Sequence, residues 1–113
     1  MKKEISSYRF DIVIIRETIL RIMNDFKLFG ISISVSGNEQ TAYQELMSQL
    51  IPAMENLRVK NKNKLMQVLY RIDISEEKLI QSKSKFPQTN LSEIIAHLVI
   101  EREMQKVITR KYF

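Results

Sequence analysis

The stretch LSEIIAHLVIEREMQKVI, residues 91–108, has the apolar spacing of a helix but presents two different apolar faces. At about 100° per residue, one face carries the apolar side chains of its first half: Leu91, Ile94, Ile95, Leu98 and Val99. Those of the second half lie nearly opposite: Ile100, Met104, Val107 and Ile108. One neighbouring surface covers only one of these faces. The second face therefore needs a separate cover, from another part of the chain or from a second chain.

Few turn-forming residues interrupt the chain, which has 113 residues but only two Gly and two Pro. An all-β domain with many tight turns requires far more, so helices should dominate. The length suits one domain with a substantial core. We therefore predict an all-α fold, a small bundle of four to five helices with a long N-terminal amphipathic helix and a long C-terminal helix.

The first helix is predicted between about residues 8 and 29, where apolar residues alternate at spacings of four and three. They form a seam three heptads long: Tyr8, Ile12, Ile15, Ile19, Ile22, Phe26 and Phe29. Gly30 follows at a position where a left-handed residue commonly ends a helix. Such a seam packs either within the chain's own bundle or against a second chain.

The segment that follows alternates Ile31, Ile33 and Val35 with serines, which is the period of a strand. A single strand has no pairing partner, so we interpret residues 31–36 as an extended linker, with a strand as the alternative. The predicted organisation is an N-terminal helix plus linker over residues 1–36 and a helical core over residues 37–113. The two parts are expected to pack as one folded unit.

The core should contain a second helix with one apolar face: Tyr43, Met47, Leu50, Met54 and Leu57. Pro52 lies inside this helix and predicts a kink or a helix restart. The polar stretch RVKNKNK, residues 58–64, leaves open whether the second and third helices are continuous. Ser75 and Asn90 are good capping residues, and they predict the starts of a short helix and of the last helix.

Composition excludes several kinds of chemistry. The chain has no Cys and one His, so disulfides, thiolate chemistry and a structural zinc site are excluded. Gly30 and Gly37 are too few and too far apart for a phosphate-binding loop. Because no motif combines a nucleophile, a base and an orienting group, we predict no enzymatic activity, no metal site and no cofactor.

His97 is the one side chain that ordinarily titrates near neutral pH, and Glu93 and Glu101 flank it one helical turn away on either side. The two carboxylates lie on opposite sides of the ring and do not converge on one metal ion. We interpret the group as helix-surface pairing. His97 would lie at the rim of the contact if the second face of the last helix met another chain.

The N-terminal segment is interrupted by Glu4, Arg9 and Asp11, so we expect no export signal. No segment approaches the roughly 20 apolar residues of a membrane-spanning helix, and we expect a cytoplasmic protein without membrane contact. The formal net charge of +5 favours an acidic partner, although thirteen acidic residues are interspersed among eighteen basic ones.

Basic residues form three groups: Arg58, Lys60, Lys62 and Lys64; Lys78, Lys83 and Lys85; and Arg102, Lys106, Arg110 and Lys111. Arg102, Lys106 and Arg110 repeat every four residues and form a stripe along the last helix that would suit phosphates. A nucleic-acid-associated regulatory protein is therefore the alternative function. Glu103 neighbours this basic stripe, and no helix pair has the compact turn of a DNA-reading helix-turn-helix.

Abundant apolar helix surface without a catalytic motif predicts a non-enzymatic helical protein–protein interaction module. A few helices have difficulty covering this many separate stripes, so we expect a homo-oligomer, such as a homodimer, and an unidentified protein partner. The predicted oligomer interface uses the seam of the first helix, the second face of the last helix, or both: Ile12, Ile15, Ile19, Ile22, Phe26, Phe29, Ile100, Met104 and Ile108.

Overall fold

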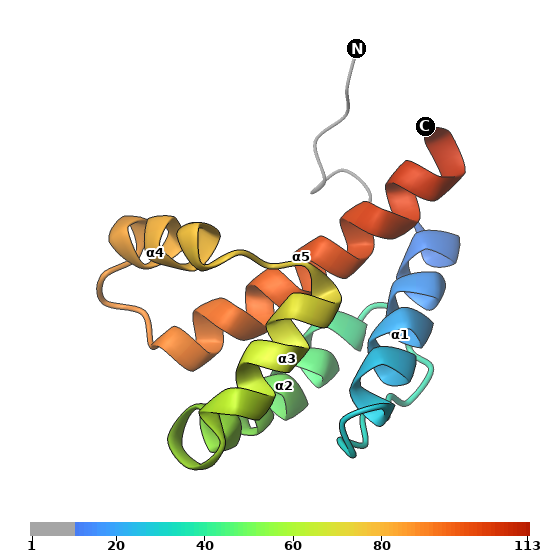
Figure 1. The fold of residues 1–113 in the computed structure, drawn as a ribbon. Helices are drawn as coiled ribbons and strands as arrows, with labels where there is room; N and C mark the ends of the chain where they lie inside the picture. Colours follow the sequence, from blue (N-terminus) through green and yellow to red (C-terminus); the bar gives the residue numbers. More distant parts are fainter. Residues whose placement is uncertain (1–10) are drawn as a thin grey trace.

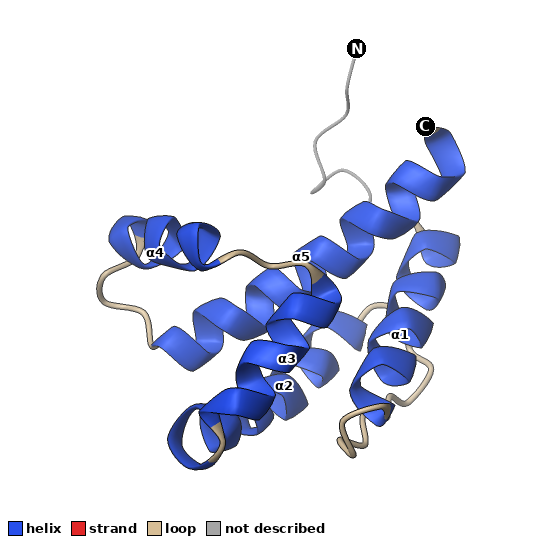
Figure 2. Cartoon of the chain, in the orientation of Figure 1, coloured by secondary structure: helices blue, strands red, loops and turns tan. Residues whose placement is uncertain are grey.

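The computed structural model describes residues 11–113, which fold into five helices. The helices are α1 (Ile12–Lys27), α2 (Ala42–Lys60), α3 (Lys62–Ile72), α4 (Glu76–Lys85) and α5 (Leu91–Tyr112). Residues 11–113 contain no strand (Figure 2). The predicted all-α fold is confirmed. None of the helices in this part of the chain is long and apolar enough to cross a membrane.

The face change in α5 occurs where this helix passes from one neighbour to another. α5 runs through the molecule and packs against both α2 and α1 (Figure 1). Its first apolar face joins a large core with α2, where Leu50 and Met54 are fully buried. Its second face forms a smaller cluster with Ile14 of α1: Met104, Val107 and Ile108. Two helices of one chain therefore cover the two stripes.

One chain covers both stripes of α5 and most of the α1 seam, so the apolar surface that suggested a homodimer is largely buried within the chain, and the homodimer stays a prediction. Seven of the nine predicted interface side chains are at most 9% exposed: Ile15, Ile19, Ile22, Phe26, Ile100, Met104 and Ile108. Ile12 is exposed and Phe29 is partly buried. Tyr8, the first residue of the predicted seam, lies outside the described residues. An interface between copies would have to use side chains in addition to Ile12 and Phe29.

The connection between α1 and α2 forms neither helix nor strand over residues 31–36, as the linker interpretation predicted. Gly30 has a φ of +73°, in the left-handed region that a helix end commonly uses. The Gln49 side chain holds the linker by accepting the Ser34 amide proton at 3.0 Å and donating to the Ser34 carbonyl at 2.5 Å. Ile33 is buried, so the linker also contributes to the core.

The second and third helices are separate. α2 continues through Pro52 without the predicted restart and ends at Lys60. Asn61 then begins α3 by accepting the Lys64 amide proton at 3.1 Å. Ser75 and Asn90 cap α4 and α5 in the same way, as predicted, because their side chains accept amide protons from the first turn of each helix.

Candidate interaction groove

α4 differs from the other four helices because none of its residues is buried. It lies beside α5 at the edge of the molecule (Figure 1). Leu79 is partly buried against the main core, whereas Ile80 is 67% exposed. α4 has too few apolar residues to be packed as tightly as α1 or α2, and it leaves a groove between itself and the rest of the fold.

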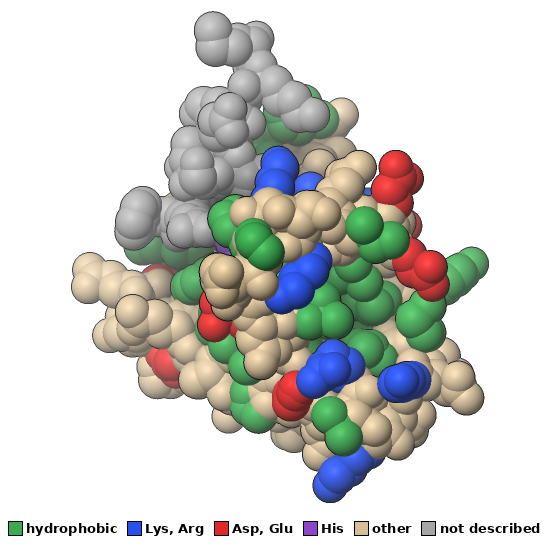
Figure 3. All heavy atoms as spheres, turned by 90° about the vertical axis from the view of Figure 1, so that its left-hand side faces the viewer, with side chains coloured by type: hydrophobic (Ala, Val, Ile, Leu, Met, Phe, Trp, Pro, Cys, Tyr) green, Lys and Arg blue, Asp and Glu red, His purple; other side chains and the backbone are tan. Residues whose placement is uncertain are grey.

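The groove has a volume of about 480 Å³ and lies between α4, α2 and α5. Its most buried lining is apolar: Met47 of α2, with Ile94 and Leu98 of α5. Phe86, at the end of α4, is 57% exposed at the same site. Figure 3 shows the α4 side of the molecule, where hydrophobic side chains gather between Lys and Arg side chains. This volume lies in the range of natural binding pockets.

The two helical walls of the groove differ in charge. On α4, the lining side chains repeat at spacings of four and three: Lys78, Ser82 and Lys85. On α5, they repeat every four residues: Glu93, His97 and Glu101. Lys78 and Lys85 form no ion pair with another described residue. The groove therefore has one basic wall, one wall with two carboxylates, and an apolar floor.

His97 is held between the two helices that form the floor. The Tyr43 hydroxyl lies 2.5 Å from its Nδ1, and its Nε2 lies 3.3 Å from Oε2 of Glu101. Both contacts are satisfied when Tyr43 donates to Nδ1 and the Nε2 proton is donated to Glu101. Of the two flanking carboxylates, only that of Glu101 contacts the ring. Tyr43 is 54 residues away in sequence, so helical spacing alone gave no sign of it.

No group of three or more metal-binding side chains occurs within residues 11–113. The contacts of His97 orient its ring in the wall of the groove, between one hydroxyl and one carboxylate. The oriented His97 ring places a polar group beside apolar side chains. Binding pockets commonly use such polar groups to fix the orientation of a ligand.

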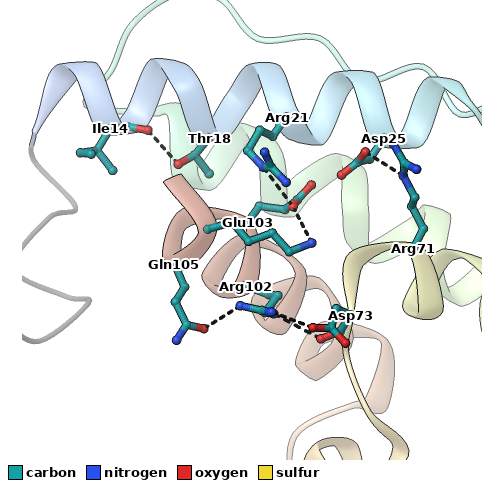
Figure 4. A network of polar contacts seen from close by, with 10 residues as sticks. Ile14, Thr18, Arg21, Asp25, Arg71, Asp73, Arg102, Glu103 and Gln105 are labelled. Carbon is teal, nitrogen blue, oxygen red and sulfur yellow. Dashed lines mark hydrogen bonds and ion pairs between the residues drawn. The ribbon is translucent and has the colours of Figure 1, made fainter. Parts of the chain in front are cut away.

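A second polar cluster lies between α1 and α5 (Figure 4). Glu103 is fully buried, and its Oε1 lies 3.5 Å from Nε of Arg21 and 3.6 Å from Nζ of Lys106. Neither Glu103 oxygen has a hydrogen bond of standard geometry. Burial, together with the nearby carboxylate of Asp25, raises the pKa of Glu103 to about 7.

The pKa of Asp25 is shifted in the opposite direction from that of Glu103. Burial by itself would raise its pKa, but interactions with the Glu103 carboxyl and the Arg71 guanidinium outweigh burial and lower the pKa of Asp25. Arg71 donates to Oδ1 of Asp25 at 3.2 Å. The surroundings therefore favour the protonated form of Glu103 and the charged form of Asp25. This arrangement makes the cluster a structural element of the α1–α5 contact.

The predicted basic stripe on α5 is largely engaged within the chain. Arg102 donates to Oδ2 of Asp73 at 2.7 Å and to the Asp73 carbonyl at 3.2 Å (Figure 4). Lys106 is directed toward buried Glu103, and Arg110 is exposed. The stripe therefore does not present three free cations on one surface.

Comparison with protein-family models, with curated proteins and with solved structures finds no match for this chain.

Proposed function

We propose that the protein is a non-enzymatic helical interaction module that binds an amphipathic helix of a partner protein in the groove between α4 and the α2–α5 pair. The observation that carries this proposal is α4, which buries none of its own residues yet forms one wall of an apolar groove. Most of the α1 seam and the second stripe of α5 are covered within the chain, whereas Ile94 and Leu98 of the first stripe line the groove.

The dimensions of the groove suit about two turns of helix. At a rise of about 1.5 Å per residue, Lys78 and Lys85 are separated by about 10 Å along α4, and Glu93 and Glu101 by about 12 Å along α5. A bound helix with apolar residues at positions i, i+4 and i+7 would place them on Met47, Ile94 and Leu98. Phe86 would close over one side of this helix.

The charges of the two walls specify the flanks of the bound helix. A row of Asp or Glu on one flank would meet Lys78 and Lys85, and a row of Lys or Arg on the other would meet Glu93 and Glu101. Exposed ion pairs contribute little affinity each, about 0.2–1 kcal/mol, but they discriminate against partners with the wrong charge. We therefore expect preference for a helix with one acidic and one basic flank.

Three synthetic helical peptides with the same apolar stripe test this proposal. One has an acidic and a basic flank, one has two acidic flanks, and one has two basic flanks. The wild-type protein should bind the mixed peptide about threefold to tenfold more tightly than either of the others, measured by fluorescence anisotropy. The Lys78→Glu/Lys85→Glu variant, whose two walls are both acidic, should instead prefer the peptide with two basic flanks.

The matched control is Lys60→Glu/Lys62→Glu, which changes the net charge equally at the turn between α2 and α3 and should keep the wild-type preference. Met47→Glu should abolish binding of all three peptides while far-UV circular dichroism remains unchanged. Absence of binding, or binding that Met47→Glu leaves intact, would refute the groove as the site. An unchanged preference in the Lys78→Glu/Lys85→Glu variant would refute the proposed role of its walls.

A further inference from the structure

A second surface, independent of the groove, lies where α1 ends and α2 turns into α3. Residues 56–72 contain five Lys and Arg and no Asp or Glu. The turn itself alternates lysine and asparagine, with α2 ending at Lys60 and α3 beginning at Lys62. This segment is the longest part of the described chain that combines several cations with no acidic residue.

The fold brings the end of α1 to the same place. The Nζ of Lys64 lies 4.0 Å from the position that a Cβ on Gly30 would occupy. Gly30 follows Lys27, the last residue of α1, by three positions, and its amide donates to the Lys27 carbonyl at 3.0 Å. We call the surface formed by Lys27, Lys60, Lys62 and Lys64 the lysine end.

Cations elsewhere on the molecule are largely neutralised. Arg16 pairs with Glu39, Arg58 with Glu55, Arg71 with Asp25, Arg102 with Asp73, and Lys111 with Glu17. The four lysines of the lysine end have no ionic partner among residues 11–113. Within residues 11–113, cations without an ionic partner are therefore concentrated here and, to a smaller extent, on α4. Lys and Arg side chains stand out over the lower part of the face in Figure 3.

We propose that the lysine end binds the phosphate backbone of a nucleic acid. Four lysines at one end of the fold, without an ionic partner in the described part of the chain, supply the electrostatic contacts that dominate such binding. Asn63, which is exposed between Lys62 and Lys64, adds an amide of the kind that commonly contacts phosphate oxygens. This is a different site from the α5 stripe, where Arg102 and Lys106 are engaged within the chain.

The same surface suits a lipid bilayer less well. Helices that bind in the plane of a membrane carry a broad apolar face that contains Trp, Phe or Leu. Here the aromatic side chain of Phe29 packs against the core. The exposed apolar side chains nearby are divided among the end of α1, α2 and α3 and include no exposed Phe: Leu28, Val59, Met66 and Tyr70. Binding should accordingly be electrostatic and independent of base sequence.

The experiment uses the full chain and a fluorescently labelled random-sequence DNA duplex, with anisotropy measured from about 50 to about 200 mM salt. Four phosphate contacts predict a slope of about −3 to −4 in a plot of log K against log salt concentration. The Lys60→Gln/Lys62→Gln variant should reduce the magnitude of the slope by about 2 and weaken binding at low salt. Lys78→Gln/Lys85→Gln removes the same charge from α4 and should leave the slope unchanged.

Three results would overturn the proposal. One is absence of binding to the duplex, and to a single strand of the same sequence, at the lowest salt. Another is an equal loss in both double variants, which would show a response to net charge alone. The third is tighter binding to vesicles that contain phosphatidylserine than to the duplex, which would identify a membrane surface as the ligand. None of these outcomes bears on peptide binding in the groove.

Discussion

α1 and α4 both pack beside α5, but they do so in contrasting ways. α1 buries seven residues, including Ile22 and Phe26 completely, and it contributes Asp25 to a cluster of charges inside the contact. α4 buries none. The difference follows from sequence: α1 has an apolar residue at nearly every third or fourth position, whereas Leu79 and Ile80 are the only apolar residues in α4. The long apolar seam of α1 is therefore mostly covered by the rest of the chain, whereas α4, which has no such seam, remains at the surface.

The largest expected effect is the loss of a core side chain from α1. Phe26 is fully buried in the main core, so Phe26→Ala removes its packing and leaves a cavity. We expect the free energy of unfolding to fall by about 3–5 kcal/mol. Urea unfolding followed by circular dichroism measures this change. A loss below about 1 kcal/mol would mean that α1 is not packed as described.

The second largest effect is a pH dependence of the free energy of unfolding, which arises from the charges inside the α1–α5 contact. Folding raises the pKa of Glu103 from 4.5 to about 7, so the folded chain retains a proton that the unfolded chain releases between these values. This contribution to stability is fully present below about pH 4.5 and is lost as the pH rises through about 7. The maximum loss is about 3 kcal/mol, since each pKa unit corresponds to about 1.4 kcal/mol.

Glu103→Gln is the matched variant because it replaces the carboxyl by a neutral amide of the same shape. It should remove this pH dependence, and above neutral pH it should be more stable than the wild type by about 1–3 kcal/mol. Urea unfolding at about pH 5 and about pH 8 measures the difference. Carboxylates with a lowered pKa, such as that of Glu39, respond only at lower pH. Equal pH dependence in both proteins would contradict the raised pKa.

A smaller change in the free energy of unfolding is expected when the contact between Tyr43 and His97 is removed from the groove. Tyr43→Phe keeps the ring but removes the hydroxyl that contacts His97. The loss of one partly buried hydrogen bond should reduce the free energy of unfolding by about 0.5–1.5 kcal/mol. The NMR shift of the His97 ring nitrogens should also change, because Nδ1 loses its donor. Unchanged nitrogen shifts would show that this contact does not form in solution.

The smallest change in the free energy of unfolding is expected for a substitution in α4. Ile80 is largely exposed, so Ile80→Ala should change the free energy of unfolding by less than about 0.5 kcal/mol. The same urea titration as for Phe26→Ala gives the value. A loss of 2 kcal/mol or more, on the order of a buried side chain, would show that α4 is packed against the body and that the groove is closed.

Local patterns predicted the helices well, because periodicity and capping are properties of neighbouring residues. The sequence predicted most of the α1 seam, the caps at Ser75 and Asn90, and the extended linker at residues 31–36. Pro52 was a partial exception, because its helix continues through it. These features depend on contacts within one or two turns of the chain.

Long-range contacts were not predictable in the same way. α1 covers the second stripe of α5 because of the way in which the chain folds back on itself. The spacing of apolar residues along the sequence does not specify this arrangement. The contacts of His97 with Tyr43 and of Arg102 with Asp73 join residues 54 and 29 positions apart. Glu103 did carry a signal: it lies three positions after Ile100 and four before Val107, on the buried stripe itself. An acidic residue at such a position indicates a buried charge.

Native-state hydrogen exchange at two protein concentrations tests most directly whether a single chain covers its long apolar stripes and leaves α4 at the surface. The amides of Ile100, Met104 and Ile108 should exchange only through global unfolding, with equal protection at both concentrations. The amides of α4 should exchange through local opening at lower free energy. Protection of Ile100, Met104 and Ile108 that rises with concentration would show that a second chain covers this face, and would contradict the account.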